Sequence, residues 1–293
     1  MEIQRSLLNW YRRNARVFPW RVRDVDPYVV VVSEIMLQQT QAQRVTEALP
    51  RFLEQFPTVH ALAQATNAQM IRQWKGMGYN SRALRLRDAA RMIVLRHDGV
   101  VPSDVDALRE LPGIGPYASA SIATFAYNKR VPVLDVNVRR VYSRWMRRQH
   151  TTIDVESDNV LTQFAMNVIP ARSASRWHHA VMDLGATICT ARKPLCTSCP
   201  MADLCPSAHV LEQAQRAKRA EPMFRGEPQR LWRGRFVNAL REAPAGLPPS
   251  ALVAAGGATR LANDEQAWFR ALIDALVRDG VVERSGRRIR LAD

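Results

Sequence analysis

Three kinds of feature are missing from this chain of 293 residues. It has no run of 18 apolar residues, so we expect no transmembrane helix. Its charged N-terminal stretch, MEIQRSLLNWYRRNARVF, lacks the apolar core of a secretory signal, which predicts a cytoplasmic protein. Cysteine is scarce, with four residues in the whole chain, and in a reducing compartment we do not expect these four to form disulfides.

Acidic residues are also in short supply. The chain has 27 Asp and Glu against 42 Lys and Arg, which gives a formal net charge of +15. Such an excess can serve solubility alone. Nucleic acid is the favoured partner, because each phosphate contact releases counterions and so favours binding. Gly and Pro are near average and 47% of the residues are hydrophobic, which indicates a globular chain of two or three domains.

No convincing β-sheet is predicted before residue 210. The stretch YVVVVSEIMLQQT starts with a β-branched run that favours a strand by propensity. Glu34, Gln38 and Gln41 nevertheless fall at helical spacing, and we predict a helix there. The apolar spacing predicts helices at 3–16, most of 29–55, 58–63, 67–74, 81–97, 104–111, 117–127, from 135 onward, 154–168 and 172–187.

Composition changes after the cysteines. The segment 211–230 is polar, basic and interrupted by proline and glycine, which predicts a linker. The pattern that follows predicts three helices and then two short strands, at 231–242, 249–255, 265–279, 281–284 and 287–291. This order is a winged-helix arrangement, although the same outline fits many small interaction modules.

The four cysteines stand close together in a C-x6-C-x2-C-x5-C pattern. They are Cys189, Cys196, Cys199 and Cys205. Four thiolates hold zinc or a [4Fe–4S] cluster equally well by charge. Structural zinc sites usually pair two C-x-x-C knuckles, and here there is one, so the uneven spacing favours the cluster over zinc and over four independent thiols.

The sequence LPGIGP, at Leu111–Pro116, is typical of a tight turn between two helices. Gly113 and Gly115 allow positive φ and close approach of the backbone. The amides at the start of the next helix then point at an anion. Such contacts position a nucleic acid without reading its sequence. An ordinary helix–helix turn is the alternative.

Two carboxyl groups stand in contrasting surroundings. Glu34 lies among valine, isoleucine and methionine, where an apolar site raises a carboxyl pKa and keeps the group able to donate a proton. Asp135 precedes a helix, whose N-terminus favours the ionised form. An ionised carboxylate beside a reacting sugar stabilises an oxocarbenium-like centre. The pair can therefore divide the roles of acid and electrostatic stabiliser. A helix cap and a solvated glutamate are the alternatives.

Polar and loop residues between these carboxyls are candidates for contacts with bases. The amides of Gln38 and Gln39 can bond base edges, or be solvated on a helix. Met77 and Tyr79, in the glycine-punctuated loop 75–80, can wedge into a base stack and support an extruded nucleotide, or pack in the core.

Taken together, the motifs resemble the helix-hairpin-helix DNA glycosylase superfamily and, within it, the MutY-type adenine DNA glycosylases. Over residues 7–206 they are FPWR, VSEIMLQQTQ, KGMGYNSRA, LPGIGPYASASI, LDVNVRRV, AVMDLGATIC and the cysteine set. The resemblance implies an all-α, two-lobed fold with a [4Fe–4S] cluster loop and a small winged-helix-like C-terminal domain. The implied parts are a six-helix lobe (23–132), a cluster lobe (1–22 plus 133–210), the linker (211–230) and the C-terminal domain (231–293). The implied partner of the monomer is double-stranded DNA with an A:8-oxoguanine or A:G mispair, in association with the nucleoid.

The resemblance also implies catalytic roles. Glu34 protonates N7 of an extruded adenine, Asp135 stabilises the oxocarbenium ion, and Asn137 helps to place Asp135 and the water. Tyr117 stands where related lyases carry a nucleophilic lysine. Because a tyrosine cannot form a Schiff base, we expect a monofunctional glycosylase.

The same resemblance implies contacts with DNA, and the chain departs from the family pattern at several positions. Tyr79 matches the residue that is wedged beside the opposite 8-oxoguanine, and Gln39 matches the neighbour of that residue in the DNA. Arg21 matches an adenine-pocket position. The departures are Val136 for a glycine, Asn80 for a second tyrosine and His179 for a glutamine or glutamate. The residues after 206 are also too few for the Nudix-like domain of longer members.

Two alternatives remain at this point. One is a thymine or uracil mismatch glycosylase on the same fold, although a pyrimidine has no N7 for Glu34 to protonate. The other is a non-catalytic iron–sulfur regulator that binds DNA. It gives no reason for Glu34 and Asp135 to occur together in their motifs.

Overall fold

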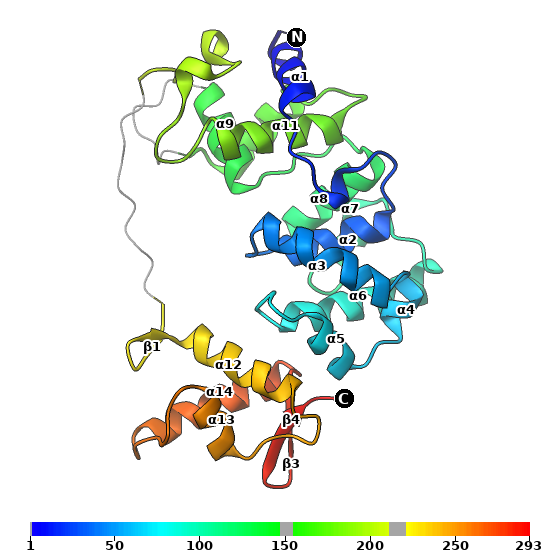
Figure 1. Cartoon of the computed structure of the whole chain (residues 1–293). Coiled ribbons are helices and arrows are strands. Elements are labelled where there is room, and N and C mark those ends of the chain that lie inside the picture. Colours follow the sequence, from blue (N-terminus) through cyan, green and yellow to red (C-terminus); the bar gives the residue numbers. More distant parts are fainter. Residues whose placement is uncertain (1, 147–154, 211–220) are drawn as a thin grey trace. The chain divides into compact units, whose positions relative to one another are not determined.

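The computed structural model of the chain describes residues 2–146, 155–210 and 221–293 (Figure 1). Most of the described residues lie in helices, and the strands among them all follow residue 220. No helix in these ranges is both long and apolar enough to cross a membrane. The all-α fold predicted for the first 210 residues is therefore confirmed over the part of the chain that the structure describes.

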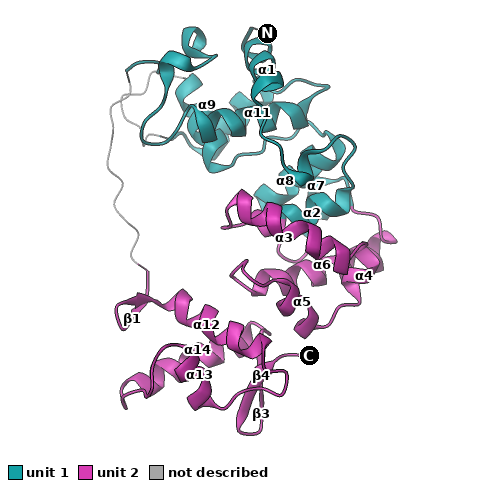
Figure 2. Ribbon diagram, viewed as in Figure 1, with its two compact units in different colours: residues 1–34, 102–110, 114–218 teal, residues 35–101, 111–113, 219–293 magenta. Residues whose placement is uncertain are grey.

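The chain divides into two compact units, shown in different colours in Figure 2. Unit 1 holds residues 1–34, 102–110 and 114–218, and unit 2 holds residues 35–101, 111–113 and 219–293. The elements that lie in unit 1 are α1 (Glu2–Asn14), η1 (Pro19–Arg21), most of α2 (Pro27–Leu37), α7 (Val105–Arg109), α8 (Pro116–Tyr127), α9 (Val136–Met146), α10 (Asp158–Val168), α11 (Ala174–Thr187), η2 (Cys196–Ser198) and η3 (Ala202–Leu204).

Unit 2 contains two runs of elements. The first run is the end of α2 followed by α3 (Ala42–Gln55), α4 (Val59–Ala63), α5 (Asn67–Gln73) and α6 (Ser81–His97). The second run is β1 (Met223–Phe224), β2 (Glu227–Pro228), α12 (Gln229–Arg241), α13 (Pro249–Ala255), α14 (Glu265–Arg278), β3 (Val282–Ser285) and β4 (Arg288–Leu291).

The core of unit 1 brings the N-terminal helix against helices from the second half of the chain. Helix α1 packs on α11, and α9 packs on both α10 and α11. Leu7 of α1 is fully buried in this cluster, as are Tyr142 of α9 and Trp177 of α11. The Trp177 indole donates a hydrogen bond to the Tyr142 hydroxyl at 2.8 Å, so the buried polar atoms of both rings are satisfied. This packing fixes the start of α9, where Asp135 lies, and the end of α11, where the cysteine loop begins.

In unit 2 a buried arginine ties the end of α2 to the loop 75–80. The Arg82 side chain on α6 is 7% exposed and donates to the carbonyls of Ile35, Met36 and Gln38. The same guanidinium donates to the Met77 carbonyl at 2.8 Å. Because a buried guanidinium needs all of these acceptors, the loop and the end of α2 are held in one arrangement.

The single helical stretch predicted for most of 29–55 is two helices, α2 and α3. The break falls at Gln38–Gln41, where Gln39 has a left-handed φ of +55°. Within α2 three of the valines expected to favour a strand, Val30, Val31 and Val32, are buried. Their packing outweighs the small intrinsic cost of β-branched residues in a helix.

The C-terminal part of unit 2 has the predicted order of three helices and a hairpin. Strands β3 and β4 pair antiparallel, with Val282 opposite Leu291 and Ser285 opposite Arg288. Its core contains Trp232, Phe236, Phe269 and Leu276. The linker predicted at 211–230 is wrong in its second half, because β1, β2 and the start of α12 occupy 223–230. Its first half, 211–220, lies outside the described residues.

Candidate active site

Glu34 is the buried acid of the site. It lies on α2 with 5% of its surface exposed, between the buried residues Ser33 and Ile35. Burial raises the pKa of Glu34 to about 7, and the Asp135 carboxylate adds to the rise. The Ser121 hydroxyl and the Arg21 guanidinium oppose that rise. A carboxyl with this pKa is partly protonated at neutral pH and can donate a proton.

Asp135 caps the start of α9 with both of its oxygens. The Val138 backbone N–H donates to Oδ1 at 2.7 Å, and Asn137 Nδ2 donates to Oδ2 at 3.0 Å. Burial raises the pKa of Asp135, whereas these hydrogen bonds and the Arg140 guanidinium lower it. The helix N-terminus was expected to keep this group ionised. In the folded chain the effect of burial on the pKa of Asp135 is larger than the effect of the helix N-terminus. The ionised form therefore depends on the hydrogen bonds that Asp135 accepts.

Asn137 is itself held from the other side. Its Oδ1 accepts a hydrogen bond from Arg140 Nη2 at 2.8 Å, and the same nitrogen donates to the Gly185 carbonyl at 2.7 Å. A Cβ on Gly185 would lie 2.8 Å from the Asn137 Cβ, which is closer than real Cβ atoms approach. Gly185 was not identified from the sequence. It lies in the AVMDLGATIC motif, and its packing against Asn137 explains why that position takes glycine.

Tyr117 and Ser121 lie one helical turn apart on α8. Burial raises the pKa of Tyr117 well above its ordinary value, and Glu34 and Asp135 raise it further. The phenol therefore stays neutral, while 38% of the residue remains exposed. The Ser121 hydroxyl lowers the pKa of Glu34 and of Tyr117. Ser121 is fully buried, and its oxygen has no partner at hydrogen-bond geometry within the described residues. Ser121 was missed because a serine in a small-residue helix carries no signal of its own.

A buried ion pair fixes Arg21 beside Glu34. Asp183 on α11 is fully buried and accepts from Arg21 Nη1 at 2.9 Å and from Arg16 Nε at 2.7 Å. The Arg21 guanidinium lies 4.9 Å from the Phe18 ring centroid, and Phe18 stacks on Trp20. The FPWR motif is thus a cation–aromatic arrangement that holds one arginine. Asp183 and Arg16 were not identified from the sequence, although an aspartate in an apolar helix requires a buried cation.

His179 faces the same group of charges from α11. Its ring stacks on Phe125, with the centroids 4.3 Å apart. Burial lowers the pKa of His179 well below its ordinary value, and Arg21 and Arg16 lower it further. The imidazole is therefore neutral and offers one donor and one acceptor.

The residues predicted to contact bases differ in their exposure to solvent. Tyr79 is 52% exposed with φ +46°, and Gln39 is also exposed with positive φ. The Gln38 amide instead donates to the Gly113 carbonyl at 3.2 Å. Met77 is 3% exposed, so the side chain predicted to wedge into a base stack is a core residue of unit 2. The glycine on each side of it leaves the loop free to turn while the apolar side chain is buried.

The two glycines of the LPGIGP turn do different things. Gly113 has φ +81°, and a Cβ there would lie 3.0 Å from the Arg85 Cβ. Gly115 has φ −91°, which any residue can adopt, and nothing lies near a Cβ built on it. Gly113 is therefore required for the backbone of the turn, whereas Gly115 leaves the exposed start of α8 uncovered by a side chain.

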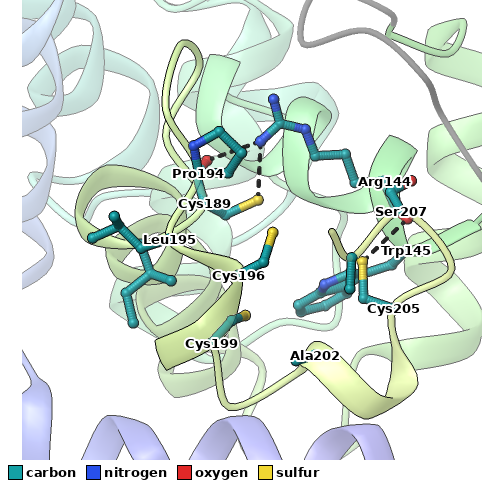
Figure 3. A pocket seen from close by; sticks show the side chains of 12 residues that line it. Arg144, Trp145, Cys189, Pro194, Leu195, Cys196, Cys199, Ala202, Cys205 and Ser207 are labelled. Atoms are coloured by element: carbon teal, nitrogen blue, oxygen red, sulfur yellow. Dashed lines mark hydrogen bonds between the residues drawn. The ribbon is translucent and has the colours of Figure 1, made fainter. Parts of the chain in front are cut away.

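The four cysteines line one pocket in unit 1, as Figure 3 shows. None is in a disulfide. No three His, Cys, Asp or Glu side chains in the described ranges are placed to hold a single metal ion. Arg144 Nη1 lies 3.2 Å from Cys189 Sγ. Burial raises the pKa of Cys199 to about 12 and that of Cys205 to about 11. Thiolates at these positions need nearby positive charge, which the iron of a [4Fe–4S] cluster supplies, so the donor set fits the cluster.

Comparison with known proteins defines the class. Residues 32–163 match the family model of HhH-GPD superfamily base excision DNA repair proteins, and residues 189–205 match that of the iron-sulfur binding domain of endonuclease III. A thermostable thymine-DNA glycosylase has a similar structure, with a TM-score of 0.65 and 28% identity over 70% of this chain and 94% of that one. Endonuclease III bound to DNA shares the fold, with a TM-score of 0.60 and 22% identity over 71% of this chain and 94% of that one. The protein is a DNA N-glycosylase with a [4Fe–4S] cluster domain.

Sequence relatives narrow this class to one family. An adenine DNA glycosylase of Mycobacterium tuberculosis (strain CDC 1551 / Oshkosh) is 39% identical over 93% of this chain and 89% of its own length. That of Mycolicibacterium smegmatis is 43% identical over 67% of both chains, and the human enzyme is 35% identical over 68% of this chain and 38% of its own. The chain belongs to the adenine DNA glycosylase family.

Proposed function

We propose that the enzyme removes adenine mispaired with 8-oxoguanine or guanine by hydrolysing its N-glycosidic bond. The observation that carries the proposal is the coupling of two carboxyls in unit 1, of which Glu34 is buried and Asp135 is half-buried. Glu34 has a pKa of about 7, and Asp135 is close enough to contribute to that rise. An acid and a charged stabiliser in one site are what departure of a purine requires.

The reaction follows from these groups. The Glu34 carboxyl donates its proton to N7 of the adenine, which makes the base a better leaving group. The C1′–N9 bond then breaks, its electron pair goes to the base, and neutral adenine departs. The Asp135 carboxylate stabilises the positive charge left on the sugar. Water adds its oxygen to C1′ and loses a proton to a carboxylate of the site, which leaves an abasic sugar.

Tyr117 supports a reaction that stops at this stage. Its raised pKa keeps the phenol neutral, so it is a hydrogen-bond donor and not a nucleophile at C1′. Without an amine at this position no Schiff base forms, and the DNA strand is not cut. The product of a monofunctional enzyme is therefore an intact strand with an abasic site.

Contacts with the mispair are assigned to exposed and charged residues. Arg21 lies beside Glu34 and the neutral ring of His179 lies near Arg21, and both are proposed to bind the extruded adenine. Tyr79 and Gln39 are exposed in left-handed conformations, and we propose that they contact the opposite base and its neighbour. Action as a monomer and association with the nucleoid are part of the same proposal.

A second candidate is removal of thymine or uracil from mismatches with guanine. The observation in its favour is the structural similarity to a thymine-DNA glycosylase, at 28% identity. The buried acid argues for adenine, because a pyrimidine offers no N7 to protonate. The relatives at 35 to 43% identity cited above are adenine DNA glycosylases, which supports the same choice.

An excision panel tests the proposal. The purified chain is incubated with duplexes that carry A:8-oxoguanine, A:G, T:G or U:G, and released bases and strand breaks are measured separately. We expect adenine from the first two duplexes and strand breaks only after alkali. Release of thymine or uracil without adenine would establish the second candidate. Strand breaks before alkali would contradict the monofunctional assignment.

A further inference from the structure

The C-terminal part of unit 2, residues 221–293, sorts its charges into two groups. It has twelve arginines, no lysine and nine acidic residues. Six arginines pair with carboxylates of the same segment, and they are Arg225, Arg230, Arg233, Arg235, Arg284 and Arg290. The arginines without a carboxylate partner in the described residues are Arg241, Arg260, Arg270, Arg278, Arg287 and Arg288.

Four of these six gather along one groove. Two adjoining pockets that share Pro249, Phe269 and Arg270 run between α13, α14 and the β3–β4 hairpin. The arginines that line them are Arg260, Arg270, Arg284, Arg287 and Arg288. Arg284 pairs with Asp274, and the lining of both pockets contains no acidic residue. The groove therefore has a strong excess of positive charge.

The surfaces on each side of the groove suit close approach of a large anion. On α14 the exposed residues around Arg270 are Gln266, Ala267 and Ala271, which are short or uncharged. The turn of the hairpin is formed by Gly286 and the exposed Arg287. Figure 1 shows α14 and this hairpin as separate elements of the same C-terminal part.

We propose that this groove binds the phosphate backbone of duplex DNA and gives the enzyme a second DNA contact, separate from the site that releases the base. Guanidinium groups match phosphate oxygens in pairs, and each contact releases counterions. The large apolar side chains at the bottom of the groove are buried, with Phe269 8% and Ile289 5% exposed. A protein partner would need accessible apolar anchors, and these two large side chains are covered.

Two triple variants of the full chain test this assignment. The groove variant is R260A/R270A/R287A. Among the residues that the structure describes, these side chains make no ion pair, and their one hydrogen bond runs from Arg270 to its own helix. The control variant, R230A/R233A/R278A, removes the same charge from the same domain outside the groove. Binding to an undamaged duplex is measured between 50 and 200 mM salt (roughly the range over which phosphate contacts dominate).

In the groove variant we expect the slope of log K against log salt to fall by about 2 to 3, because each phosphate contact contributes about 0.9. Affinity at about 100 mM salt should fall at least tenfold, whereas the control variant should change by less than about threefold. Replacing the same three groove residues by lysine should restore most of the slope, since the charge is kept.

Base release at saturating enzyme separates this proposal from the proposed function. Once the duplex is fully bound, the groove variant should release the base from the duplex at the same rate as the unaltered enzyme. An equal slope in the groove and control variants would overturn the groove assignment, even if excision is normal. Loss of the slope in the alanine variant with no recovery in the lysine variant would also overturn it, because the defect would then be structural.

Discussion

Asn137 donates a hydrogen bond to Asp135 across 3.0 Å, from a position two residues further along the chain. Arg140 holds the amide of Asn137 from its other end. The carboxylate proposed to stabilise the oxocarbenium ion is therefore oriented by a side chain that is itself fixed. Burial raises the pKa of Asp135, so this hydrogen bond also helps to keep the group ionised.

Asn137→Ala should slow base release without weakening DNA binding. Losing a hydrogen bond to a charged group costs about 1.5 to 3 kcal/mol, which corresponds to roughly 10- to 100-fold in rate. The pKa of Asp135 should rise further. The acidic limb of the rate profile, on which Asp135 becomes protonated as pH falls, should then move to higher pH. Single-turnover rates measured across pH would show this shift, and a slower enzyme with an unmoved limb would contradict the positioning role.

Excision should also decline at alkaline pH. The proposed active form of Glu34 is protonated and its pKa is about 7, so rates should fall as pH rises through that value and approach a tenfold loss per unit above it. Glu34→Gln should remove most activity at every pH, since the amide cannot donate to N7 as an acid. Tyr117→Phe serves as the control, because it removes the phenol, another acid near the site, and should leave the alkaline limb in place. A limb that disappears with Tyr117 would assign it to the phenol.

Asp183→Asn should destabilise unit 1. The substitution leaves Arg21, with 8% of its side chain exposed, without its carboxylate partner. Breaking a buried ion pair on one side costs about 3 to 5 kcal/mol. Arg16→Gln is the matched control, because Arg16 retains 35% of its side-chain exposure and should cost less. Urea unfolding of the two variants at neutral pH measures the difference, and equal losses would show that Arg16 and not Arg21 carries the pair.

Cys199→Ser should remove the iron–sulfur cluster. The unaltered protein should be brown, absorb near roughly 400 nm and contain about four irons per chain. The variant should lose both colour and iron. Ser198→Ala, the neighbouring residue in the same loop, should keep them, because its hydroxyl bonds only the Leu195 carbonyl within the described residues. A colourless unaltered protein with one zinc would contradict the cluster.

Local pattern predicted most of the helices. Helix α6 and helix α13 begin and end at the predicted residues, because their apolar spacing and flanking residues act within a few turns. The cysteine spacing predicted the cluster domain for the same reason, since all four ligands lie in one short loop. Glu34 was identifiable because its apolar neighbours in the chain are also its neighbours in the fold.

The sequence did not predict which residues far apart in the chain come into contact. Asp183 holds Arg16 and Arg21 across more than 160 positions, Gly185 is required by Asn137, and Ser121 lies against Glu34. The sequence by itself determined most of the helices, the cluster loop and the place of the two carboxyls on or before a helix. The tertiary structure decided that Asp135 is buried enough for its pKa to rise. It also decided which side chains surround the two carboxyls, because packing between distant helices fixes burial and partners, and no local spacing encodes it.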